Sequence, residues 1–166
     1  MRIPPEEVYA TWPAPNYVDP VRRGPALIIT NAVFMLLITS AVLLRFYSRL
    51  SCRRWFGWDD FFIGIALIFS LGLGIVVIVA FARYGWDRHL WDLRITELQN
   101  ASIMAFVGKI VYSLATTFVR ISLLCFLLRL IRDSGHKRFV WALRAAMLWQ
   151  IGVCIAFLAL TTFLCV

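Results

Sequence analysis

Residues 61–82, FFIGIALIFSLGLGIVVIVAFA, run for 22 positions without a charged side chain. A bilayer core about 30 Å thick is crossed by about 20 apolar residues in a helix. In lipid, every backbone N–H and C=O group must pair within the protein, so a single span of this length has to be helical. This stretch therefore predicts a transmembrane helix.

Three further stretches of the chain have the same character. Residues 26–44 hold 19 positions without a charge, and residues 145–166 hold 22 whose one strongly polar side chain is Gln150. Residues 101–128 are apolar apart from Lys109 and Arg120. The sequence therefore predicts an all-α, polytopic transmembrane helix bundle with four spans. We expect the spans at about 26–47, 60–82, 101–130 and 140–166, within a transmembrane domain over 25–166.

The composition argues against the alternative, in which these helices form the core of a large soluble protein. Of the 166 residues, 61% are hydrophobic and 16% are charged. A soluble domain has about 45–50% apolar and about 25% charged residues. Four such stretches leave too few polar residues to cover a globular core, so the lipid bilayer is the expected surrounding.

Residues 1–24 differ from the rest, because they hold five prolines and charges of both signs. They lack the continuous apolar stretch that a cleavable signal peptide requires. We expect a flexible extracellular arm, with the first span serving as its own insertion signal.

The formal net charge of +8 is distributed unevenly between the connections. The two connections on one side of the predicted spans carry nine basic and three acidic side chains, whereas the arm and the connection on the other side carry six of each. Short basic connections stay on the cytoplasmic side of a membrane. We therefore expect residues 45–60 and 129–144 inside and the N-terminus outside. The basic charge reflects membrane topology, and no nucleic-acid partner is predicted.

The third span carries a polar stripe. Its members Lys109, Ser113, Thr116 and Arg120 are spaced so that all four share one helix face. A cation inside a membrane is costly, so both cations should face the bundle interior or a water-filled cavity. A ligand or ion site and a fixed structural ion pair are both open interpretations. The apolar stretches 26–44, 61–82 and 145–166 of the other three spans contain no Asp or Glu that could supply the counter-charge.

The connection before the second span contains Gly57, Asp59 and Asp60. Either carboxylate is suited to cap the following helix and to meet the positive end of its dipole. The same carboxylates can pair with Arg45 or Arg49. Helix capping alone and a conformational latch in a receptor are the two interpretations.

The connection after the second span contains Gly85, Asp87, His89 and Asp92. We predict no metal site here, because no second His or Cys is near and structural zinc sites favour Cys and His. The sequence also holds no catalytic triad, P-loop, dinucleotide fingerprint or HExxH motif. We therefore expect neither an enzyme nor a cofactor.

Several of these residues occur in an order that resembles a known family, the fungal rhodopsin-domain integral membrane proteins. Arg45-x-Tyr47-x-Arg49 followed by Gly57-x-Asp59-Asp60 resembles the family's first inner loop. Gly85-x-Asp87-x-His89 resembles its outer-loop pattern of glycine, glycine and histidine, with Asp87 in place of the second glycine.

Two further motifs carry the same resemblance. Arg120-x-Ser122-x-Leu124-x-x-x-x-Arg129 resembles the signature of the third span, which usually has lysine at the position of Arg120. Residues 163–166, Phe-Leu-Cys-Val, match the start of a Phe-x-Cys-x-Pro pattern after the fourth span. The resemblance covers about residues 25–166.

The resemblance implies a receptor-like, seven-helix fold with its N-terminus outside, in the plasma membrane. On that reading the four spans are an incomplete set, and helices five to seven are missing. The missing part would hold the partners of Lys109 and Arg120 and a possible disulfide partner of Cys165. A retinal Schiff base is not implied, because the chain lacks the required late-span lysine.

Three functions follow as hypotheses. The leading one is a partial receptor-like protein that senses an external signal, with an unknown cytoplasmic partner. The second is a small transporter or channel subunit that uses the polar stripe on an anionic solute. The third is a structural four-helix membrane protein or a non-functional fragment.

Overall fold

The computed structural model describes residues 11–16, 19–22, 24–53, 56–93, 95–131 and 137–164. Within these residues the chain forms four long helices and contains no strand. The helices are α2 (Ala26–Tyr47), α3 (Trp58–Arg83), α4 (Ile95–Ile131) and α5 (Lys137–Leu164). A π-helical segment, η1 (Ser48–Arg53), continues α2, and a 3-10 turn, η2 (Leu90–Asp92), lies between α3 and α4. The predicted all-α class is confirmed.

All four helices are long enough and apolar enough to cross a membrane. The prediction of four spans is therefore confirmed. α4 is the longest at 37 residues, which corresponds to about 55 Å at 1.5 Å per residue. It begins at Ile95 where we expected a span from residue 101, because a helix can continue beyond the bilayer core into the polar region.

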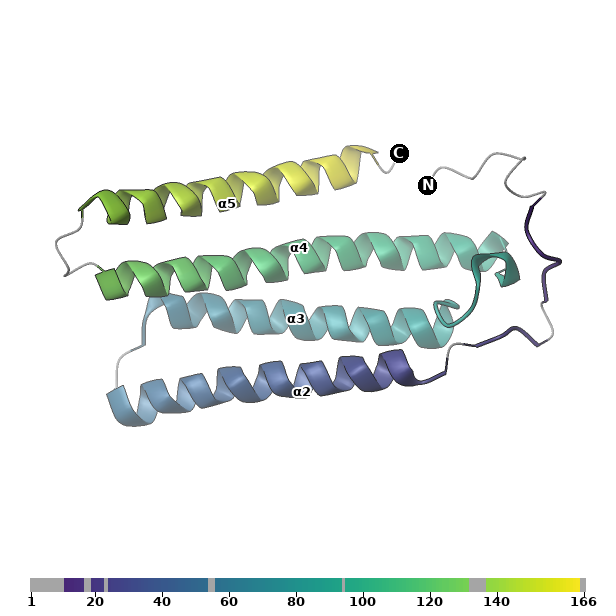
Figure 1. Cartoon of the computed structure of the whole chain (residues 1–166), viewed down its shortest axis with the longest axis horizontal. Helices are drawn as coiled ribbons and strands as arrows, with labels where there is room; N and C mark the ends of the chain where they lie inside the picture. The colour runs from purple at the N-terminus through teal and green to yellow at the C-terminus, as the bar shows by residue number, and fades with distance from the viewer. Residues whose placement is uncertain are drawn as a thin grey trace.

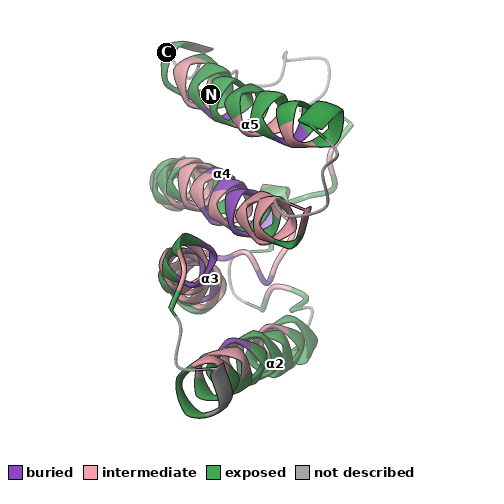
Figure 2. Cartoon of the chain, turned by 90° about the vertical axis from the view of Figure 1, so that its left-hand side faces the viewer, coloured by how far each residue is buried: buried purple, intermediate pink, exposed green. Residues whose placement is uncertain are grey.

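The four helices lie side by side in one layer and in chain order, and each runs antiparallel to the one before it (Figure 1). Figure 2 shows the same layer from its end, with α3 and α4 between α2 and α5. Extensive contacts join α2 with α3, α3 with α4, and α4 with α5, and the contact between α3 and α4 is the largest. The two broad faces of the layer are left open.

Large apolar side chains are exposed on the helices of the layer. Leu36, Ile68 and Leu148 are each about 70% exposed, at 71%, 69% and 73%. Figure 2 shows that exposed residues dominate α2 and α5, whereas buried residues gather on α3 and α4. Such apolar patches are a liability in water, but they are the surface that lipid tails contact in a bilayer.

Aromatic rings and small residues hold the layer together. Phe118 of α4 stacks on two rings of α3, with centroid distances of 6.2 Å to Phe62 and 5.6 Å to Phe69. On the other side of α3, Gly74 lies against Met35 of α2, so closely that a Cβ atom at this position would collide with the Met35 sulfur. Small residues allow this close approach of two helices in a membrane.

The layer has two distinct ends. At one end, which we call the arm end, residues 84–93 connect α3 to α4 and the described residues of the arm lie beside them. α3 ends there at Arg83, and the chain turns at Gly85, whose positive φ of 71° suits glycine. At the other end, which we call the arginine end, α2 and η1 meet the first turn of α3 and the last turns of α4.

Candidate functional site

Five charged side chains meet at the arginine end and form the arginine–aspartate cluster. Arg45 contacts both carboxylates, with 2.7 Å from Nη2 to Asp59 Oδ2 and 2.9 Å from Nε to Asp60 Oδ1. Arg49 makes the same two contacts at 3.4 and 3.6 Å. Arg129 comes from α4, and its Nη1 lies 3.6 Å from Asp59 Oδ1. The cluster therefore joins three successive helices.

The start of α3 positions the two carboxylates. Asp60 Oδ2 accepts a hydrogen bond of 3.2 Å from the backbone N–H of Gly57, the residue before the helix. Both carboxylates lie in the first helical turn, where the helix dipole favours negative charge. A Cβ atom at Gly57 would collide with the Asp59 carboxylate and would lie 3.0 Å from Arg129 Nη1. The glycine is thus needed for the close approach of the charged groups.

The carboxylates are the most enclosed part of the cluster. The side chains of Asp59 and Asp60 are 3% and 0% exposed, whereas those of Arg45 and Arg129 are 31% and 32% exposed. Buried charges persist only when they are paired and hydrogen-bonded. Asp60 therefore combines a capping hydrogen bond with ion pairing, so helix capping alone does not describe its contacts.

α4 supplies two further contacts, one from Ser122 of the third-span motif and one from Phe126, which no predicted motif specifies. The Ser122 hydroxyl donates a hydrogen bond of 2.6 Å to the backbone carbonyl of Asp59. The ring of Phe126 lies under both α2-side guanidinium groups, 5.6 Å from Arg45 Cζ and 5.9 Å from Arg49 Cζ. Such cation–π contacts stabilise an arginine that has lost part of its water. Positions 122, 126 and 129 share one helix face, so the spacing of the two motif residues is the signal that would have identified Phe126.

The polar stripe of α4 is divided among different surroundings. Ser113 is buried, and its Oγ lies 3.9 Å from Cys154 Sγ of α5. The Thr116 hydroxyl donates to the backbone carbonyl of Tyr112 at 2.9 Å. Lys109 is exposed, and so is Arg120, whose Nη1 donates to Gln150 Oε1 at 3.1 Å. That both cations face the bundle interior or a water-filled cavity stays a prediction.

At the arm end the predicted residues His89 and Gly85 lie in the connection between α3 and α4. The His89 ring stacks on Trp91 with a centroid distance of 4.5 Å and an angle of 5° between the rings. Trp91 also contacts Trp12 of the arm at 6.3 Å. Gly85 lies against Leu93, with which a Cβ atom would collide.

Charged groups add to this contact between the arm and the connection. The backbone N–H of Asn16 donates to Asp92 Oδ1 at 2.9 Å. Arg22 Nε lies 3.7 Å from Asp87 Oδ2, which places a cation from the arm beside a nearly buried carboxylate. The described arm residues are therefore in contact with the α3–α4 connection. Cys165, the predicted disulfide partner of a further segment, lies outside the described residues.

The fold and these contacts define a multi-pass helical membrane protein with a buried charge cluster at one end. The family model described as the fungal rhodopsin domain matches residues 44–166, which is well over half of the chain. The chain belongs to this family, and the resemblance found in its motifs is confirmed. The match includes every residue of the arginine–aspartate cluster. No curated protein and no solved structure matches the chain.

The substitution Asp60→Asn tests how much the cluster contributes to stability. It keeps the shape of the side chain but removes a fully buried negative charge that faces Arg45 and Arg49. Removing one partner of a buried pair costs about 3–5 kcal/mol. We expect this loss in the free energy of unfolding, measured in detergent micelles by circular dichroism.

The matched control is Asp19→Asn, which makes the same chemical change on an exposed arm residue. A surface change of this kind shifts the free energy of unfolding by about 0.5 kcal/mol or less. Equal effects of the two substitutions would show that the cluster does not stabilise the fold.

Proposed function

We propose that the chain is a receptor-like membrane protein that senses a signal at the arm end and responds at the arginine end. The observation that carries this proposal is the arginine–aspartate cluster, which ties α2, α3 and α4 together through buried charges. A buried ionic network has few good arrangements, so it favours discrete states over continuous deformation. An element of this kind is what a switching protein needs.

The arm end has features suited to receiving a signal. Aromatic rings and charged groups from the arm and from residues 84–93 contact one another there. α3 and α4 run from this end to the cluster, and they share the largest helix contact of the layer. The packed side chains of α3 and α4 can therefore transmit a change of contacts at the arm end to the arginine end.

The proposed orientation places the arm end outside the cell and the arginine end in the cytoplasm, at the plasma membrane. The excess of basic residues in the connections at the arginine end supports it. A cytoplasmic partner would then meet the arginine end, where the cluster is located.

Orientation is testable by labelling single cysteines in intact cells, in a variant whose native cysteines are replaced. We expect a membrane-impermeant maleimide to label Leu90→Cys, which is exposed at the arm end, without permeabilisation. Phe139→Cys, exposed near the start of α5, should be labelled only after permeabilisation. The reverse pattern would overturn the proposed orientation.

Coupling between the two ends is the property that separates a receptor from a purely structural protein. Trp91→Ala removes the contacts of the Trp91 ring with Trp12 and His89 at the arm end. Spin labels at Leu50 and Leu130, both exposed near the cluster, report the distance between η1 and α4. An aromatic pair contributes about 0.5–1.5 kcal/mol. We therefore expect the relative populations of the distance distribution to change by up to about tenfold.

The control for this measurement is Leu36→Ala, which truncates an exposed apolar side chain of α2 outside both ends. It should leave the distance distribution unchanged. An unchanged distribution in Trp91→Ala as well would contradict the receptor proposal.

The second candidate function is transport of an anionic solute. It is favoured by Lys109 and Arg120, which have no described carboxylate within salt-bridge distance. Anion flux into liposomes that disappears in Arg120→Leu would support transport in place of sensing.

A further inference from the structure

An aromatic contact and a backbone hydrogen bond attach the arm to the α3–α4 connection. The Trp12 ring lies 6.3 Å from the Trp91 ring, and the backbone N–H of Asn16 donates to Asp92 Oδ1 at 2.9 Å. Asn16 is itself held in a turn, because its side chain donates to and accepts from the backbone of Asp19, at 2.7 and 3.1 Å. Asp92 is only 6% exposed. The arm is therefore fixed to a buried group of the connection.

An ion pair attaches the arm close to the start of α2. Arg22 Nε lies 3.7 Å from Asp87 Oδ2, and Asp87 is only 7% exposed. Arg22 precedes Ala26, the first residue of α2, by four positions, a length of chain that spans at most about 14 Å. While this contact persists, the start of α2 stays near the α3–α4 connection. We call these arm contacts, made by Trp12, Asn16 and Arg22, the strap.

The start of α2 has little packing of its own. Four of its first five residues are exposed, whereas Val42, toward the arginine end, is buried. In the described part of the chain, α2 packs extensively only on α3 and on η1, which continues it, and the contact of α2 with α3 is smaller than that of α3 with α4. A segment with few buried contacts opens easily. The strap therefore adds an attachment that packing does not provide at this end.

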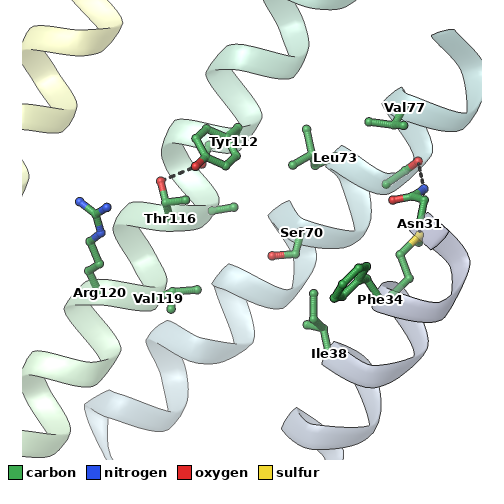
Figure 3. A pocket seen from close by; sticks show the side chains of 13 residues that line it. Asn31, Phe34, Ile38, Ser70, Leu73, Val77, Tyr112, Thr116, Val119 and Arg120 are labelled. Carbon is green, nitrogen blue, oxygen red and sulfur yellow. Dashed lines mark hydrogen bonds between the residues drawn. The ribbon is translucent and has the colours of Figure 1, made fainter. Parts of the chain in front are cut away.

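α2 is held closely against α3 about halfway between the strap and the arginine–aspartate cluster. Gly74 lies against Met35 with no room for a Cβ atom, and the Asn31 side chain donates to the backbone carbonyl of Gly74 at 3.0 Å (Figure 3). Met35 is nine residues after Ala26 and ten before Arg45. The lengths of helix on either side are therefore about 14 and 15 Å at 1.5 Å per residue. A rigid helix held at its middle moves in opposite directions at its two ends.

We propose that α2 is a lever, with the strap as a releasable catch at the arm end and the Gly74 contact as the fulcrum. Release of the strap lets the start of α2 move away from α4. The arginines at the other end of α2 then move in the opposite direction, relative to the carboxylates of α3. The proposal names the moving element of the receptor-like function, on which its biological meaning rests.

The strap is the weaker of the two attachments at the ends of α2. The Arg22 side chain is 68% exposed, and an exposed ion pair contributes little because water and salt screen it. The carboxylates of the cluster are almost completely buried, and removing a partner from a buried pair is strongly unfavourable. A signal at the arm end therefore meets the attachment that opens first.

Distances between spin labels test the proposal on the full chain in lipid nanodiscs. At the arm end the labels replace Leu27 of α2 and Ile103 of α4, which are 42% and 51% exposed. The strap is weakened by Trp12→Ala combined with Arg22→Gln, both of which lie outside the four helices. We expect a longer distance between these labels, with a population that rises by about two- to tenfold, the range that loss of one aromatic pair gives.

The lever also predicts how the two ends compare. If α2 moves as one rigid helix, the fraction of molecules in the released state is the same at both ends. Labels at Leu50 and Leu130 should therefore show a second distance with the population found at the arm end. A longer distance at the arm end alone would mean that only the start of α2 frays, which contradicts the lever. Unchanged distances at both ends would contradict the strap.

The matched control combines Val21→Ala with Arg83→Gln. These substitutions also shorten an apolar side chain and remove a cation at the arm end, and both residues are exposed. The two distance distributions should equal those of the unmodified chain. A shift as large as that of the strap variant would overturn the proposal, because loss of charge and apolar surface at this end would then be sufficient.

Failure of the lever is distinguishable from failure of the receptor proposal, which is tested with Trp91→Ala. Labels at the arginine end that respond to Trp91→Ala but not to the strap variant would overturn the lever alone, since α3 and α4 would then transmit the change without α2. Labels that respond to neither variant would overturn both proposals.

Discussion

Two adjacent carboxylates, Asp59 and Asp60, are almost completely buried at the start of α3, and the arginine end is organised around their charge. Burying them costs free energy unless cations and hydrogen-bond donors surround them. Arg45 and Arg49 approach from the α2 side, and Arg129 approaches from α4. The need to pair these charges therefore fixes how three helices meet at this end.

This constraint matters because the helices form a single layer. In the described part of the chain, each helix packs extensively only on its neighbours. Apolar packing therefore connects α2 with α4 only through α3. Lipid tails are as apolar as these side chains, and apolar packing therefore gives little preference for one arrangement over another. The charged contacts, the close packing at Gly74 and the stacked rings of Phe118 supply the specificity.

Much of the fold could be predicted from the sequence, because charge-free stretches of about 20 residues have one stable solution in lipid. The residues of the cluster were also visible as a motif, since Gly57 and the carboxylates precede a helix and follow two arginines. The contributions of Ser122, Phe126 and Arg129 depend on how α4 rotates against α3, which local sequence does not determine. For the same reason, helix periodicity placed Lys109 and Arg120 on one face but could not say what that face meets.

We infer that Arg45 and Asp60 stabilise the protein through their contact with each other, and a double-mutant cycle tests this contribution most directly. The free energy of unfolding is measured for the unmodified chain, for Arg45→Gln, for Asp60→Asn and for the double variant. Residues that share a network have coupling energies of about 0.5–3 kcal/mol. We predict a value in this range, with the double variant less destabilised than the sum of the single ones. Additive effects would contradict the account.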